Sequence, residues 1–452
     1  MMAVADQPAI APRVSVQPAD SVFTPEWSAT KRLAFRWCFL YFGLYVVLTQ
    51  MLTSLLLATT NDSGAFEVDM TPPARAIVVW LASHVFRIGH PIATVETGSG
   101  DRYYDWIVLA VILALAVVGT VIWSVVDRRR ESYAKLYSWF YVFARLSLGA
   151  TMLTYGAAKV LPLQMPFPFL TRLVEPYGNF SPMGVLWSSI GAAPAYEIFA
   201  GCAEMLGGIL MFVPRTATLG ALVCLADATQ VFLLNMTYDV PVKLLAFHLI
   251  LISLFLLAFD ARRLANLFFL NRAAAPSSPR PLFRSVRANR VALVVQILFG
   301  VWLAGANLYG SISVYNVYGP GRPKSPLYGI WNVESFALDG QLRPPLTTDS
   351  ARWQRLIFDF PQYASIQNMD EERGRTYGAK VDVNAKTFVL SGLADKNQQG
   401  NFSFTQPSAT ELIVDGVMDG HKVHAQMELF DRSKFLLVTR GFHWISERPF
   451  NR

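Results

Sequence analysis

Residues 103–130 read YYDWIVLAVILALAVVGTVIWSVVDRRR, a long apolar run followed at once by an acidic residue and three arginines. No charged residue occurs between Asp105 and Asp127, and a helix needs about 20 such residues to cross roughly 30 Å of hydrocarbon. Adjacent arginines directly after an apolar run are typical of the cytoplasmic end of a membrane span. This stretch therefore predicts a membrane helix at 104–126 whose C-terminal end faces the cytoplasm.

The composition of the whole chain agrees with a membrane protein. Of its 452 residues, 53% are hydrophobic and only 16% are charged, whereas soluble domains carry about 25% charged residues. The basic residues behind the net charge of +7 lie mainly in short loops between apolar runs, so they indicate membrane orientation and not nucleic-acid binding. The three cysteines, Cys38, Cys202 and Cys224, lie in apolar runs without C-x-x-C spacing, which predicts neither a disulfide framework nor a zinc site.

Six further apolar runs extend the pattern outward from 104–126 in both directions. The seven predicted membrane spans are 36–58, 104–126, 138–160, 194–213, 216–235, 241–259 and 290–309. Basic residues gather before the first span, in alternate connecting loops, and above all in the loop 261–289. Because positive loops stay in the cytoplasm, we expect the N-terminus to be cytoplasmic and the region after 310 to lie on the opposite side.

The regions between and around these spans have distinct compositions. Residues 1–30 are aperiodic and predict a disordered tail, and 31–137 would hold two spans joined by an outer loop. Within that loop, 74–88 mixes charged and apolar residues and is too short to span, which favours an interfacial helix. Residues 161–192 are rich in proline and aromatic side chains, which is compatible with a membrane-surface lid or with a plain aromatic-belt loop.

The last region, 315–452, changes to an alternating pattern. His421–Phe430 places apolar and polar residues on opposite faces, and Asn401–Thr405 does the same. Short runs of this kind, separated by turn residues, predict an antiparallel β-barrel or sandwich. For a barrel, the residues expected to point inward are Phe388, Leu390, Phe402, Phe404, Val423, Ala425 and Met427.

Charged residues inside the apolar runs are the main functional signal, because they are costly in hydrocarbon unless they are paired or face a cavity. One helical stripe in 138–160 contains Arg145, Gly149, Met152, Gly156 and Lys159. A stripe of opposite charge in 194–213 contains Glu197, Gly201, Glu204 and Gly208. Glycines let two helices approach closely. We therefore expect Lys159 to pair with Glu197 near the outer surface, and Arg145 to reach towards Glu204.

The following two runs add Asp227, Gln230, Lys243 and His248. Glu204, Asp227 and His248 are expected at a similar depth, which makes them candidate acid–base residues. The predicted ion-pair network comprises Arg145, Lys159, Glu197, Glu204 and Lys243. Such a network either only locks the helices together or forms a site for a polar or quinone-like ligand or a proton route. His248 is the one histidine in these runs, so one chain cannot supply a bis-histidine membrane haem, and no metal site is predicted.

Several of these motifs occur together in a known family. The series Arg145, Gly149, Gly156 and Lys159, the segment LVEPYGNFSP at 173–182, and Glu197, Glu204 and Gly207-Gly208 before Arg215 resemble the DoxX-like family of bacterial membrane proteins. The resemblance covers 138–260 and implies a four-helix core, location in the bacterial inner membrane, and a link to membrane redox work, including a thiosulfate:quinone oxidoreductase subunit. The chain departs from the short family members by its two N-terminal spans, its seventh span at 290–310 and its β domain.

The β domain in turn resembles a lipocalin-like barrel. Gly329-Ile-Trp331 opens its first predicted strand, and Arg440 lies on a predicted final strand at 435–445, where such barrels stack an arginine over the tryptophan. Trp331 is equally compatible with an ordinary core position.

Two functions remain open from the sequence. The first is a redox-linked, quinone-associated membrane protein in which Glu204, Asp227 or His248 handles protons, with quinone as cofactor and a membrane redox protein as partner. The second is a non-enzymatic module that anchors a periplasmic β domain, which binds a lipid, a small apolar ligand or an envelope protein. No Walker A, H-E-x-x-H or G-x-S-x-G motif occurs, and the sequence leaves open whether the chain is an enzyme.

Overall fold

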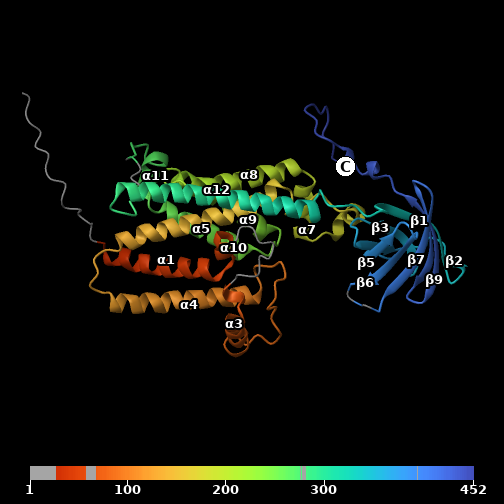
Figure 1. Ribbon diagram of the computed structural model, residues 1–452, viewed down its shortest axis with the longest axis horizontal. Coiled ribbons are helices and arrows are strands. Elements are labelled where there is room, and N and C mark those ends of the chain that lie inside the picture. Colours follow the sequence, from red (N-terminus) through yellow and green to blue (C-terminus); the bar gives the residue numbers. More distant parts are fainter. Residues whose placement is uncertain are drawn as a thin grey trace, which may run out of the picture.

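The computed structural model describes residues 27–56, 68–274, 276, 281–393, 395 and 397–451. A helical half precedes a β-barrel (Figure 1). The helices are α1 (Ala29–Leu48), α2 (Gln50–Leu56), α3 (Pro72–His84), α4 (Tyr103–Val126), α5 (Ala134–Val160), α6 (Leu170–Val174), α7 (Pro182–Gly191), α8 (Pro194–Met211), α9 (Ala217–Thr237), α10 (Lys243–Leu257), α11 (Ala261–Phe268), α12 (Val286–Val317) and α13 (Leu436–Thr439), with 3₁₀ turns η1 (Val68–Met70), η2 (Tyr177–Asn179) and η3 (Arg432–Lys434). The tail predicted at 1–30 lies almost wholly outside the described residues.

The long helices of the first half run alongside one another as a bundle (Figure 1). α5 is central: it packs on α8, α10, α12, α1 and α2, while α9 packs between α8 and α10. A helix occupies each of the seven predicted apolar runs, with α1 and α2 together covering the described part of the first. The amphipathic segment of the outer loop forms α3, which packs against α4 and leaves Ile77, Val79 and Trp80 exposed; its interfacial position stays a prediction.

Not all of these helices qualify as membrane spans, so the prediction of seven spans is not supported. Within the described ranges, three helices are long and apolar enough to cross a membrane: α4, α9 and α12. The number rises to five if each of the bent pairs α1–α2 and α10–α11 is one span. The remaining two, α5 and α8, carry Arg145, Lys159, Glu197 and Glu204 on buried faces, and these charged groups lower their hydropathy. The chain is thus a membrane-spanning protein with at least three candidate spans.

Glycines bring α5 and α8 into backbone contact, as predicted. A Cβ added to Gly149 would lie 3.1 Å from the carbonyl oxygen of Gly208, and one added to Gly156 would lie 2.9 Å from that of Gly201. The reciprocal contacts are 2.9 Å and 2.8 Å, so any larger residue would force the helices apart. This antiparallel contact determines which charged side chains of the two helices can meet.

The second half is a closed antiparallel barrel. The strands are β1 (Gly329–Leu338), β2 (Gln341–Leu342), β3 (Trp353–Phe358), β4 (Tyr363–Asn368), β5 (Arg375–Asp382), β6 (Thr387–Gly392), β7 (Gln399–Ser408), β8 (Glu411–Met418) and β9 (His421–Leu429). Each strand from β3 to β9 pairs with its sequence neighbour, β1 pairs with β3, and β9 returns to pair with β1, from Trp331 opposite Leu429 to Leu338 opposite Val423. β2 is a short strand that pairs antiparallel with the last residues of β1, Ala337 and Leu338. The barrel alternative is therefore confirmed and the sandwich alternative is wrong, since one sheet closes on itself.

Side chains fill the barrel interior. All the residues expected to point inward are buried: Phe388, Leu390, Phe402, Phe404, Val423, Ala425 and Met427. Trp331, Phe336, Trp353 and Phe358 join them in the same core cluster. The indole N–H of Trp331 donates to the carbonyl oxygen of Leu327 at 2.9 Å, so its polar atom is satisfied and the residue serves as an ordinary core aromatic.

The predicted stacking of Arg440 on Trp331 is wrong. The region 435–445 forms no strand: it contains α13 and an irregular segment, and the Arg440 guanidinium lies 4.5 Å from the ring centroid of Phe450. The physical reason is that the barrel is already closed without a further strand. β1 already pairs with β3 on one side and with β9 on the other, which leaves no free edge for a further strand.

The proline-rich segment 161–192 lies between the bundle and the barrel. It contains α6, η2 and α7, and α7 lies at the barrel end of the bundle (Figure 1). The Leu170 N–H donates to the carboxylate of Asp359 at the end of β3 over 2.8 Å, and the side-chain amide of Asn179 donates to the Glu372 carboxylate. These bonds tie the segment to the barrel, while its other face covers the end of the bundle.

Candidate functional site

A buried ion pair joins α5 to α8. Nζ of Lys159 contacts Oε1 of Glu204, and the two side chains are only 8% and 5% exposed. The predicted pairing of Lys159 with Glu197 is therefore wrong. Side chains on a helix point towards its N-terminus, so the long side chain of Lys159 extends inward along α5. Gly201 leaves room for this path, since its added Cβ would lie 2.8 Å from Cβ of Lys159.

A second carboxyl group, that of Asp227 on α9, completes the cluster. Asp227 interacts electrostatically with Glu204, and Lys159 interacts electrostatically with both carboxyl groups. One ammonium balances only one carboxylate, so a neutral cluster carries a proton on one of the two carboxyl groups. The arrangement of two carboxyls and one ammonium can therefore hold one mobile proton without leaving a net buried charge.

This cluster borders a cavity of about 310 Å³ in the bundle, which residues of α7 also line. Its walls are mostly apolar and aromatic, as is usual for small-molecule sites. They include Met152 and Tyr155 from α5, Trp187 and Ile190 from α7, Tyr196 from α8, Val231 and Leu234 from α9, and Leu245 and Leu249 from α10. The proline-rich segment therefore contributes a side of the cavity, and its interpretation as a membrane-surface lid stays a prediction.

The polar atoms left without a partner around this cavity are carboxyl and amide oxygens. Buried oxygens of Glu197, Glu204, Asp227 and Gln164 have no hydrogen-bond partner among the described residues, and all four residues line the cavity. Glu197 uses its other oxygen to accept the Met165 N–H at 2.9 Å. Buried polar groups are normally satisfied, so a bound molecule or water with donor groups suits this end of the cavity.

Arg145 and Lys243 lie outside the cluster, which corrects the predicted network. The guanidinium of Arg145 donates to Oε1 of Gln296 on α12, and not to Glu204. Lys243 begins α10 and pairs with Asp239 at 2.9 Å and Asp101 at 3.8 Å. Arg145 is too far along α5 from Glu204, and Lys243 points to the loop side of its helix, so only Lys159 and Glu204 of the five predicted charges form an ion pair with each other.

His248 is also separate from Glu204 and Asp227. Its Nε2 is 2.7 Å from the Tyr41 hydroxyl, its Nδ1 is 2.7 Å from the carbonyl oxygen of Leu244, and its ring stacks on Tyr45 at 3.6 Å. The carbonyl accepts only from a protonated Nδ1, so Nε2 accepts from Tyr41. A buried imidazole with both nitrogens satisfied packs α10 against α1, and it has no contact with the carboxyl pair.

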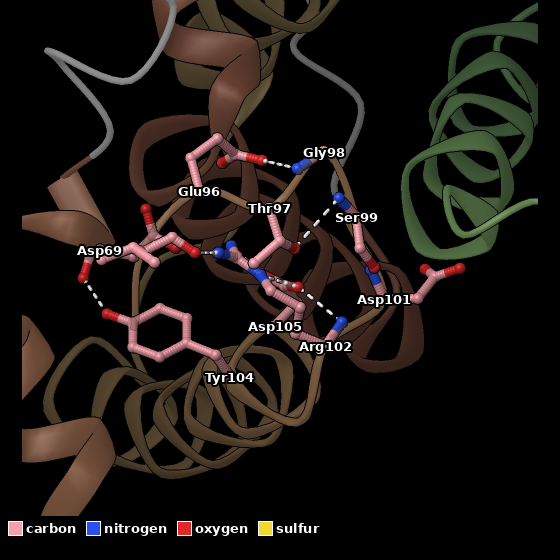
Figure 2. A network of polar contacts seen from close by, with 10 residues as sticks. Asp69, Glu96, Thr97, Gly98, Ser99, Asp101, Arg102, Tyr104 and Asp105 are labelled. Atoms are coloured by element: carbon pink, nitrogen blue, oxygen red, sulfur yellow. Dashed lines mark hydrogen bonds and ion pairs between the residues drawn. The ribbon is translucent and has the colours of Figure 1, made fainter. Parts of the chain in front are cut away.

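A second cavity of about 500 Å³ adjoins the first, and Gly98, Tyr155, Val242 and Leu245 line both. Figure 2 shows its polar wall. The Arg102 guanidinium makes a two-pronged contact with Asp105 at 2.9 and 2.8 Å, and the Tyr104 hydroxyl donates to the backbone oxygen of Asp69. Burial and the nearby Asp105 raise the pKa of the Asp69 carboxyl to about 6.

One comparison with known proteins bears on the family. Protein YwoB of Bacillus subtilis (strain 168), described as uncharacterized, is 32% identical to this chain over 124 residues, which are 27% of this chain and 79% of YwoB. The chain belongs to the YwoB family. Most of this chain lies outside the segment shared with YwoB, so it is a longer member with additional parts. No family model and no solved structure matches the chain.

Some site residues of this YwoB-family member were not singled out from the sequence. Gln296 lies in the apolar run 290–309, which also contains Asn307, and Gln164 lies in the proline-rich segment, which also contains Asn179; an amide among apolar residues is the signal that could have identified them. Trp187 is one of several aromatic residues in that segment, and its composition alone does not distinguish it from the others. Among the described residues, no group of three or more His, Cys, Asp or Glu could hold a metal ion.

Proposed function

We propose that this YwoB-family chain is a redox-linked, quinone-associated protein of the bacterial inner membrane, with a DoxX-like helical core. The observation that carries the proposal is the apolar cavity with the Lys159–Glu204–Asp227 cluster at one end. A flat, apolar ring with polar oxygens is complementary to such a cavity, because its faces contact the walls and its oxygens meet the cluster.

The residues around the cavity fit this ligand class. Trp187 and Tyr196 offer aromatic surfaces to a ring, and the free oxygens of Glu204 and Asp227 can accept from a ring hydroxyl. A quinone supplies two-electron, two-proton chemistry when bound. The chain's part is to exchange a proton at the Glu204–Asp227 carboxyl pair, while Lys159 offsets the carboxylate charge. Because most of the unpartnered oxygens, including those of Glu197 and Gln164, can only accept, the reduced, hydroxyl-bearing form should bind more tightly than the oxidised form.

The alternative function, a β domain that binds a small apolar ligand or lipid in its lumen, has less support. Aromatic side chains such as Trp331, Trp353 and Phe388 already occupy the barrel interior. A ligand there would have to displace packed core residues, at a cost of several kcal/mol.

The loop charges support placing the N-terminus in the cytoplasm and the barrel in the periplasm.

The test uses the full chain purified in a mild detergent. Organic extraction followed by mass spectrometry should recover a quinone, and an added short-chain quinol should quench Trp187 fluorescence relative to Trp187→Phe. Glu204→Gln and Lys159→Met should each weaken quinol binding at least tenfold. Arg145→Met, which removes a buried cation outside the cavity, is the matched control and should bind as the parent does. No co-purified quinone together with unchanged quinol binding in Glu204→Gln would refute the proposal.

A further inference from the structure

A basic cleft of about 210 Å³ lies where the helical bundle meets the barrel. Its residues come from four separate parts of the chain: the proline-rich segment with Phe167, the connection after α12 with Arg322 and Lys324, the end of β3 with Asp359, and η3 with Arg432. In Figure 1 this is the junction between α7, the end of α12 and β3. The tertiary fold alone brings these segments together.

The cleft holds more positive than negative charge. Arg322 bonds the Asp359 carboxylate at 2.7 Å, and Asp359 also accepts the Leu170 N–H. The side chains of Arg432 and Lys324 have no ion pair or hydrogen bond among the described residues: Arg432 lies 5.5 Å from the Phe167 ring centroid and Lys324 lies 4.7 Å from that of Tyr328. One carboxylate therefore faces three cations, and two positive charges remain unbalanced.

The guanidinium groups are also held in place and incompletely bonded. Arg322 lies 4.0 Å from the ring centroid of Phe360 and 5.1 Å from that of Phe169. Nε of Arg322 and Nε of Arg432 are both buried without a hydrogen-bond partner in the described part of the chain. Aromatic faces fix the plane of a guanidinium, and its fork of N–H donors matches the geometry of phosphate and carboxylate oxygens. An anion would satisfy both the charges and the free donors.

We propose that this cleft binds a phosphate group, carried by the headgroup of a membrane lipid. The position favours the lipid as the source. α12 is a candidate span, and its last turns expose Tyr309 at 71%, with Tyr318 at 70% directly after the helix. Such exposed tyrosines are typical of the membrane–water boundary. Arg322 and Lys324 follow Tyr318 closely in the chain, so a membrane boundary at these tyrosines would put both cations near the lipid phosphates. The proposal is independent of quinone binding.

The experiment measures lipid binding to the full chain in a phosphate-free detergent. Short-chain phosphatidylglycerol is titrated and the bound fraction is read by native mass spectrometry, with inorganic phosphate and diacylglycerol as separate arms. Arg432→Gln and Lys324→Gln should each weaken phosphatidylglycerol binding at least fivefold. Arg448→Gln, which removes a cation that does not line the cleft, is the control for net charge and should bind as the parent does.

Each outcome decides the proposal. Stronger binding of phosphatidylglycerol than of diacylglycerol, lost in both cleft variants and kept in Arg448→Gln, supports it. Saturation by inorganic phosphate at the same concentration as the lipid would overturn the lipid as the source. Equal binding of diacylglycerol, or full binding in Lys324→Gln, would overturn the phosphate site altogether. Lys324 is exposed, so its variant should fold even if Arg432→Gln does not.

Discussion

Substitutions of Lys159 and Glu204 in the Lys159–Glu204–Asp227 cluster should lower the free energy of unfolding by different amounts. Lys159→Met leaves two buried carboxyls without a counter-charge, whereas Glu204→Gln leaves Asp227 available to Lys159. For a contact ion pair at about 3 Å and an effective dielectric constant of about 20, Coulomb's law gives roughly 5 kcal/mol. Because both side chains are nearly buried, Lys159→Met should lower the free energy of unfolding by about 3–5 kcal/mol. Glu204→Gln should cost only about 1–2 kcal/mol, one charge-assisted hydrogen bond.

The assay is reversible unfolding of the full chain in mixed micelles, followed by circular dichroism. Lys243→Met, which removes a cation whose strongest ion pair is to an exposed partner, is the control and should cost below about 1 kcal/mol. A double-mutant cycle between Lys159 and Glu204 should show coupling above about 1 kcal/mol, and a cycle between Arg145 and Glu204 should be additive within about 0.5 kcal/mol. If Glu204→Gln costs as much as Lys159→Met, the role assigned to Asp227 is refuted.

Three other predictions concern the barrel, the second cavity and the topology. Residues 325–452 expressed alone should give a soluble monomer with its own melting transition, and Trp331→Ala should lower its stability by about 3–5 kcal/mol; aggregation of the parent fragment would contradict a self-contained closed barrel. Because the pKa of Asp69 rises to about 6 in the folded chain, the folded state holds this proton more tightly than the unfolded state, and stability should fall as pH rises from about 4 to about 6. Asp69→Asn should therefore raise the melting temperature at pH 7.5 and have little effect at pH 4, and an equal shift at both pH values would argue against that pKa. A reporter active only in the cytoplasm, fused after Arg452, should be silent, and strong activity would reverse the proposed orientation.

The sequence by itself determined the elements and the buried faces. Apolar runs of membrane length became helices because a backbone in hydrocarbon must satisfy its own hydrogen bonds. The alternation in His421–Phe430 identified the inward residues of β9, because successive side chains of a strand point to opposite faces. The glycines at 149, 156, 201 and 208 predicted the contact of α5 with α8, because only small residues permit it.

Tertiary structure alone decided which side chains and which strands pair with each other. Spacing along a helix determines which residues share a face, but not the register and rotation of the neighbouring helix or the direction of a long side chain. Lys159 therefore met Glu204 instead of Glu197, and Arg145 met Gln296, a residue 151 positions away. In the barrel, the pairing of β9 with β1 removed the last free edge, so the segment around Arg440 could not add a strand. Both outcomes depend on contacts between distant segments, which local periodicity does not encode.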